Sequence, residues 1–340
     1  MIENKKAHRA NIVIAALAVF VCVASVVALM MGHYPIEVDK ATMMLLSQIF
    51  PLEQTWTDQQ ATLFFNVRLP RVVTALMVGC SLAAAGAAFQ GIFQNPLVSP
   101  DILGASQGAA FGAAIAILLG VGAMGVSLSA FAFALSTVLL VLLISSRSRG
   151  NKVLIVVLTG VMISSLFSSG VSFAKLVADP QNDLPAITYW LMGSFTGAQF
   201  NITFFVSSAV MLIGCVVLFL LRWRINILTM GDSEAMTLGV NVKMLRMVII
   251  VAATLATAAS VAVTGIIGWV GLVVPHLTRM LVGSDFKKLM PASMLMGAGF
   301  LLVVDTIARL AFTSEIPIGI LTAFVGAPFF LYLITKRKQL

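Results

Sequence analysis

The chain carries little charge. Only 10% of its 340 residues are Asp, Glu, Lys or Arg, while 60% are hydrophobic, and a typical soluble domain has about 25% charged residues. So few polar side chains cannot cover a water-soluble globule of this length. Lipid offers the backbone no hydrogen bonds, so only helices and closed barrels cross it, and the apolar runs lack the alternation of barrel strands. The composition predicts an all-α, polytopic membrane protein.

Motifs for catalysis and cofactor binding are also scarce. No lysine precedes Ser or Thr, which excludes a P-loop, and HExxH does not occur. The three cysteines, Cys22, Cys80 and Cys215, lie in separate apolar runs without CxxC spacing. We therefore expect neither an enzyme nor a chain that binds a metal or a cofactor. The basic clusters lack interleaved aromatic residues, so nucleic acid is not an expected partner.

The charge that is present has a regular place. Most of the 21 Lys and Arg form clusters after long apolar runs or at the chain ends: Lys5/Lys6/Arg9, Arg147/Arg149/Lys152, Arg222/Arg224 with Lys243/Arg246, Arg279/Lys287/Lys288, and Lys336/Arg337/Lys338. Between consecutive clusters there is apolar chain for two crossings at roughly 20 residues each. Short loops rich in Lys and Arg stay cytoplasmic. The pattern predicts a multi-pass membrane protein with both termini in the cytoplasm.

We expect ten transmembrane helices in a single domain, residues 1–340. Their approximate ranges are 12–31, 71–93, 101–120, 124–145, 153–177, 201–221, 247–262, 265–282, 290–311 and 317–335. The cytoplasmic N-terminus covers 1–11, residues 32–67 and 178–200 lie outside, and 222–246 form a cytoplasmic insert. The first apolar run exceeds a signal core of about 7–15 residues and lacks an A-x-A site, so we expect it to be retained.

Small residues recur every fourth position in two of these helices. They are Gly79, Ala83, Ala87 and Gly91, then Gly104, Gly108, Gly112 and Ala116. This spacing lets helix backbones approach closely in lipid. A second interpretation stays open, in which the small residues form the smooth wall of a passage for a bulky solute.

Three arginines depart from the charge rule. Arg68 and Arg71 precede the second helix on its outer side, and Arg309 lies near the outer end of the ninth, four residues after Asp305. An acidic partner that docks from outside would be steered by such a patch, whereas lipid headgroups could also hold it. Asp305 and Arg309 can pair on one helix face, with Arg309 reaching the interface.

The cytoplasmic insert predicts a short helix. Asp232 or Ser233 can cap its start, Glu234 favours the positive end of the helix dipole, and Gly239 can end it. Met236 and Leu238 would then be available for contact. The segment is either an ordinary connector or a knob that fits a cleft in a soluble partner.

Motifs along most of the chain resemble the FecCD family, the permease subunits of ABC importers for iron–siderophores, haem and cobalamin. The matching residues, between about 60 and 335, are Arg68-Leu69-Pro70-Arg71, Gly79, Gly86, Gln90, Asn95-Pro96-Leu97, Pro100, Leu103-Gly104, Gly108, Gly268-Trp269-Val270-Gly271-Leu272-Val273-Val274-Pro275-His276, Asp305-Thr306-Ile307-Ala308-Arg309, Pro317-Ile318-Gly319 and Gly326-Ala327-Pro328.

The resemblance implies a second permease subunit, identical or not, two cytoplasmic ATPases that use the ATP, and a periplasmic or lipoprotein binding protein. Arg68, Arg71 and Arg309 would meet acidic residues of that binding protein. The coupling segment in the ATPase cleft would comprise Gly231, Asp232, Ser233, Glu234, Ala235, Met236, Leu238 and Gly239. Asn151, Lys152 and Val153 would lie at the inner gate, and Gly104, Gly108 and Gly112 on the translocation path.

A ferric siderophore is the first expected cargo, with haem, cobalamin and molybdate-type cargo open. The main alternative is a secondary transporter, which usually places ionisable groups or broken helices at mid-membrane. Asp305 is the one clear acid within a span, and Arg309 is its expected partner. This disfavours the alternative.

Overall fold

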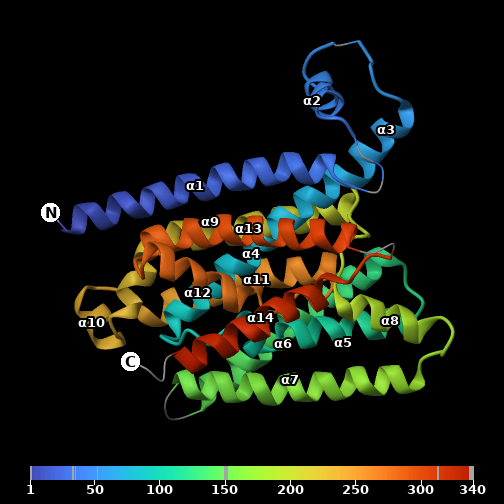
Figure 1. Ribbon diagram of the computed structural model, residues 1–340. Helices are drawn as coiled ribbons and strands as arrows, with labels where there is room; N and C mark the ends of the chain where they lie inside the picture. Colours follow the sequence, from blue (N-terminus) through green and yellow to red (C-terminus); the bar gives the residue numbers. More distant parts are fainter. Residues whose placement is uncertain are drawn as a thin grey trace.

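The computed structural model describes residues 2–32, 34, 36–51, 53–148, 152–311 and 314–336, with the backbone alone for 2–7, 152–153, 333–334 and 336. All secondary structure in these residues is helical, and the long helices lie side by side along one bundle axis (Figure 1). The expected all-α class is confirmed.

Seven of the described helices are long and apolar enough to cross a membrane. They are α1 (Ile2–Met30), α4 (Leu69–Ile92), α6 (Ala123–Arg147), α7 (Lys152–Val177), α9 (Ile202–Thr229), α11 (Val242–Thr264) and α13 (Phe286–Leu310). Three shorter apolar helices accompany them: α5 (Ala105–Leu118), α12 (Val270–Val282) and α14 (Ile318–Lys336). These helices match the ten expected spans one to one.

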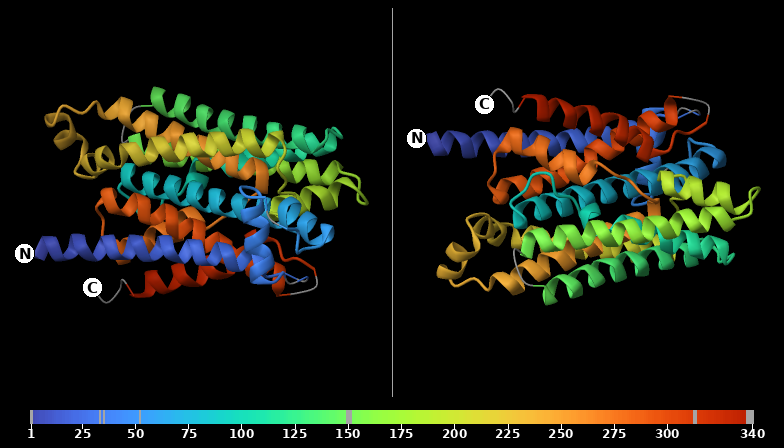
Figure 2. Two further views of the ribbon diagram at one scale, coloured as in Figure 1. Left: turned by 90° about the horizontal axis from the view of Figure 1, so that it is seen from above. Right: turned by 90° about the horizontal axis from the view of Figure 1, so that it is seen from below.

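Short elements connect the long helices. They are α2 (Val38–Ser47), α3 (Asp58–Thr62), the π-helical turn η1 (Leu63–Arg68), the 3-10 turn η2 (Pro100–Leu103), α8 (Asp183–Met192) and α10 (Asp232–Thr237). The start of α1, α10 and the end of α14 lie at one end of the bundle, and α2, α3 and α8 lie at the other (Figures 1 and 2). We refer to these as the α10 end and the α8 end. The even number of crossings predicts this arrangement.

Four helix boundaries differ from the expected ones by five or more residues. Helix α1 starts at Ile2 rather than at 12, and α11 starts at Val242 rather than at 247. Helix α9 continues past residue 221 to Thr229, because Ile225 and Leu228 on its last turns are fully buried against the bundle. Helix α12 starts at Val270 rather than at 265, because Gly265–Trp269 is irregular chain in which Gly265 and Trp269 adopt positive φ.

Close helix packing explains the small residues. A Cβ atom added at Gly79 would lie 2.2 Å from the Gly297 carbonyl oxygen, and one at Gly86 would lie 1.8 Å from that of Gly271. Helix α4 therefore touches the backbones of α13 and α12, as the small residues at every fourth position predict. Gly108 and Gly112 pack in the same way against the backbone of α6. A Cβ atom added at Gly108 would lie 2.7 Å from the Phe133 carbonyl oxygen, and one at Gly112 would lie 2.6 Å from that of Ser129.

Because α4 meets α12 without space for a side chain, we expect Gly86→Val to prevent normal packing of the bundle. Overpacking costs about 1–3 kcal/mol where neighbours can relax, and here the obstacle is backbone. The measurement is the fraction of monodisperse protein in detergent and its melting temperature. Gly122→Val is the control, since a Cβ atom at Gly122 meets nothing within 4 Å. Equal behaviour of the two variants would contradict the expectation.

Candidate transport and coupling sites

A buried ion cluster joins three parts of the chain at the α8 end. The Arg71 guanidinium on α4 donates from Nε to Asp305 Oδ1 of α13 at 2.9 Å. Its Nη1 donates to both oxygens of Glu315, at 2.9 and 2.8 Å, in the connection before α14. Asp305 is fully buried and Arg71 is 5% exposed. Such charge-assisted, bidentate contacts fix geometry as well as energy, so Arg71 holds α13 and the start of α14 together.

Two more arginines complete the cluster. Arg309 Nε lies 3.3 Å from Asp305 Oδ2, an ion pair whose alignment is too poor for a hydrogen bond. Arg309 Nη2 also donates to the Ala28 carbonyl oxygen at 3.2 Å. Arg68 Nη1 donates to the carbonyl oxygens of Leu29 and Met30, both at 2.8 Å. The two arginines thus satisfy the free carbonyls at the end of α1, where a positive charge is favoured.

The structure corrects part of the expected docking patch. The Asp305–Arg309 pair is confirmed, but Arg68 and Arg309 are 3% and 7% exposed and lie beneath the surface. The arginines therefore form no exposed surface in this structure, and their role in docking stays a prediction. Glu315, the second carboxylate of Arg71, was not anticipated, because no local pattern links two residues 244 positions apart.

The expected short helix of the insert is present as α10 at the opposite end, and its coupling role stays a prediction. Its N-cap is Gly231, with φ +123°, rather than Asp232 or Ser233. Asp232 instead accepts from Arg246 Nη2 of α11 at 2.7 Å. Gly239, with φ +75°, ends the helix as predicted, in the left-handed region that favours glycine.

Two apolar side chains are exposed on α10 and at its C-cap, beside the polar residues of the helix. Ala235 is fully buried, whereas Met236 and Leu238 are each 60% exposed. The neighbouring methionines Met230 and Met244 are exposed as well. Exposed, flexible methionines around a short helix are typical of a protein-binding surface. We call this surface, made by Met230, Met236, Leu238 and Met244, the methionine knob.

Side-chain contacts keep the methionine knob in place on the bundle. The Asn226 side chain donates to Asp285 Oδ1 at 2.5 Å and accepts from the Phe286 backbone N–H at 2.8 Å. Gln94 Nε2 donates to the Leu228 carbonyl oxygen at 2.9 Å. These contacts would transmit a displacement of α10 to α13 and to the connection after α4.

The expected gate residues lie where the structure describes no side chains, and the expected path glycines lie at the start of α5 and within it. Asn151 is not among the described residues, and Lys152 and Val153 begin α7 without described side chains. Gly104, Gly108 and Gly112 are buried, with α6 and α7 as neighbours. Their place on the path stays a prediction, and their burial does not support it.

The start of α5 contains a sequence pattern that is also found around catalytic serines. Residues 104–108 read GASQG, which fits the GxSxG nucleophile motif. That motif needs a strand before the serine, but here a 3-10 turn precedes it and Ser106 donates to the Asp101 carboxylate. The local structure therefore does not fit a nucleophile elbow.

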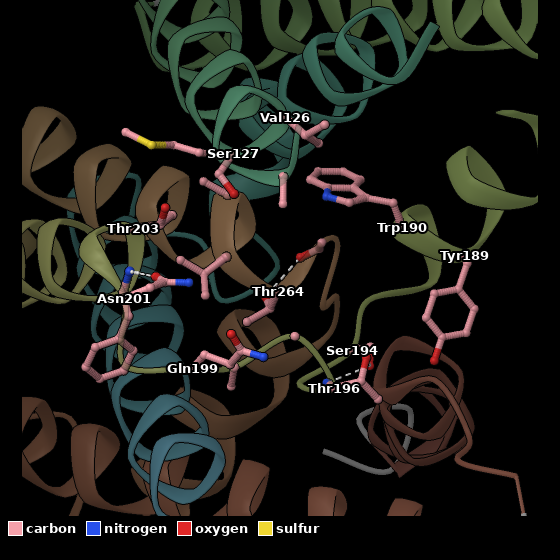
Figure 3. A pocket seen from close by; sticks show the side chains of 18 of the residues that line it. Val126, Ser127, Tyr189, Trp190, Ser194, Thr196, Gln199, Asn201, Thr203 and Thr264 are labelled. Carbon is pink, nitrogen blue, oxygen red and sulfur yellow. Dashed lines mark hydrogen bonds between the residues drawn. The ribbon is translucent and has the colours of Figure 1, made fainter. Parts of the chain in front are cut away.

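A cavity of about 600 Å³ opens at the α8 end between α6, α8, the start of α9 and the end of α11. Figure 3 shows the polar side chains around it, including Ser194, Thr196 and Asn201. Ser194 and Thr196 bond each other at 2.8 Å, and the Asn201 carbonyl caps α9 through the Phe204 N–H. Their polar atoms serve the local backbone, and no charged side chain lines the cavity.

Known proteins resemble this chain along nearly its whole length. Residues 17–336 match the FecCD transport family. The chain is 40% identical over 323 residues to the molybdate import system permease protein MolB of Haemophilus influenzae, covering 95% of each. It is 38% identical to a probable iron chelatin transport system permease protein of Helicobacter pylori, covering 81% of this chain and 83% of that one. Other relatives are named for hemin and cobalamin import.

A solved structure agrees with the fold. An inward-facing metal-chelate type ABC transporter superposes with a TM-score of 0.84 at 39% identity, covering 95% of this chain and 98% of that chain. The motifs, the ten-helix arrangement and the exposed α10 all lie within the matched region. The chain therefore belongs to the FecCD transport family of ABC-importer permeases.

Proposed function

We propose that this chain forms one half of the membrane passage of an ATP-driven importer, which moves a ferric siderophore or similar metal chelate into the cytoplasm. The methionine knob is the observation that carries the proposal. Its four exposed apolar side chains lie close in sequence to the basic residues Arg222, Arg224 and Lys243, which mark the cytoplasmic side, so a soluble partner could reach them. They fit a cleft in a soluble ATPase subunit, which would hydrolyse the ATP, so this chain is itself no enzyme.

The orientation follows from charge. The α10 end carries Arg147, Arg222, Arg224, Lys243 and Arg246, and such segments stay cytoplasmic. The α8 end then faces the periplasm of a bacterial inner membrane. A binding protein would dock there, over the ion cluster.

Coupling needs at least two states of the permease. ATP binding to the ATPases and docking of the loaded binding protein act only through different affinities for these states. The chain offers a contact for each. The methionine knob reports the ATPase state to α13 through Asn226, and Arg71 links the docking end to α13 and α14. Arg68, Arg71 and Arg309 would act from beneath the docking surface, and Glu315, whose side chain is 35% exposed, would touch the partner.

The complete transporter would contain two permease chains, identical or not, two ATPases and a periplasmic or lipoprotein binding protein, within the lipid bilayer. The chain itself would bind no cofactor and no nucleic acid. In this transporter the chain would be a single transmembrane domain without a catalytic site of its own.

Uptake by the reconstituted transporter tests both function and cargo. We expect ATP-dependent accumulation of a ferric siderophore in proteoliposomes that contain this permease, its ATPase and its binding protein. Molybdate is the second candidate, because the molybdate permease MolB matches 95% of the chain at 40% identity. Uptake of molybdate alone would exclude the siderophore, and uptake driven by a proton gradient without ATP would exclude an ABC importer.

A further inference from the structure

Helix α12 is too short to cross the membrane alone. Its 13 residues span roughly 20 Å, and the hydrocarbon core is about 30 Å thick. Since α11 ends at the α8 end, the non-helical segment Gly265–Trp269 must cover the remaining depth. This segment therefore lies within the membrane as irregular backbone.

Four N–H groups in this segment make no hydrogen bond within the described part of the chain. Among the described residues, the N–H groups of Ile266, Ile267, Gly268 and Trp269 have no partner. Irregular backbone at membrane depth is tolerated where it is buried in protein or lines a water-filled cavity, and not where it faces lipid. Ile267 is buried, but Ile266, Gly268 and Trp269 are partly exposed.

A cavity of about 690 Å³ lies beside the segment. Its walls are the end of α8, the segment itself and the face of α14 that carries Gly319, Ile320, Ala323 and Phe324. The opening lies on the surface of the single chain, where Phe324 is 73% exposed. Helix α14 crosses the front of the bundle in Figure 1, so this surface is free to face a second permease chain.

Trp269 shapes the inner wall of this cavity. It adopts φ +71°, which is uncommon for a residue other than glycine. Its ring packs on α14 where Gly326 leaves room, since a Cβ atom there would lie 2.6 Å from Trp269 Cγ. The adjacent Gly268 is different, because a Cβ atom at that position would meet nothing within 4 Å. Gly268 thus leaves open space in the wall of the cavity that it lines.

We propose that this cavity is one wall of the cargo passage and that Gly268 sets the largest cargo that can pass. The free N–H groups beside it would donate to oxygen atoms, so the fitting cargo is an oxygen-rich metal complex or oxyanion. The proposal rests on the transport function proposed above.

A size series at this position tests the proposal in the complete transporter. Gly268→Ala, Gly268→Val and Gly268→Phe should slow uptake of a ferric siderophore progressively, by roughly tenfold or more for Phe, as expected when a pocket loses the space its ligand needs. Assembly with the ATPase should not change. The control is Leu212→Phe on α9, at a position that is 59% exposed and does not line this cavity. Unchanged uptake by Gly268→Phe, or equal loss in the control, would overturn the proposal.

Water accessibility gives a readout that does not depend on transport. In a variant whose three native cysteines are replaced by alanine, Gly268→Cys should react with a membrane-impermeant, thiol-specific reagent. Leu212→Cys on α9, 59% exposed, should not react, because it faces lipid. An unreactive Gly268→Cys would overturn the proposal even if the transporter takes up its cargo. If Gly268→Cys reacts but the wild-type transporter takes up no cargo, the result counts against the proposed function alone.

Discussion

Asp305→Ala should strongly destabilise this chain. It leaves Arg71 and Arg309 buried without the carboxylate that both contact. Removing one partner of a buried ion pair costs about 3–5 kcal/mol, because the remaining charge is uncompensated. We expect a lower melting temperature in detergent and less folded protein in the membrane.

The matched control is Asp232→Ala, which removes the carboxylate of the half-exposed pair with Arg246. Exposed pairs contribute about 0–1 kcal/mol, so this variant should melt close to the wild type. Comparable losses in both variants would mean that the ion cluster has no special structural role.

The same argument changes the expected effect of Arg71→Glu. For an exposed docking residue, charge reversal would weaken binding-protein affinity and leave the fold intact. In the structure, the new carboxylate would face Asp305 and Glu315 at the position of a buried guanidinium. We therefore expect loss of folded protein together with loss of docking. A stable Arg71→Glu variant with weakened docking alone would favour the direct contact implied by the family resemblance.

Leu238→Asp should separate the permease from its ATPase without affecting the permease fold. The side chain is 60% exposed, so a carboxylate there is solvated in the isolated chain. In the complex it would enter an apolar contact. Loss of one anchor residue at an interface commonly costs at least about 2 kcal/mol, or roughly a thirtyfold weaker affinity. The measurements are co-purification of the ATPase and ATP-dependent uptake, with the melting temperature of the permease alone as the check on folding.

A leucine at the other end of the bundle provides the comparison. Leu119 is 73% exposed at the end of α5, and Leu119→Asp should leave ATPase binding unchanged. If Leu238→Asp co-purifies with the ATPase and transports normally, the methionine knob is not the coupling surface.

The sequence alone determined the fold class, the ten spans and the place of α10. The patterns behind these predictions are local: apolar runs of spanning length, basic clusters between them and small residues at every fourth position. Helices in lipid are specified locally because each backbone hydrogen bond closes within its own segment. The Asp305–Arg309 pair could be predicted for the same reason, since it lies on one helix face.

The tertiary structure decided what depends on contacts between distant segments. The bond from Arg71 to Asp305 spans 234 positions and the bond to Glu315 spans 244, so sequence periodicity could not show that these arginines are buried. The same holds for Gly268, whose neighbours come from α8 and α14 as well as from its own segment. Burial and cavities are properties of packed surfaces, and these surfaces exist only after the helices have come together.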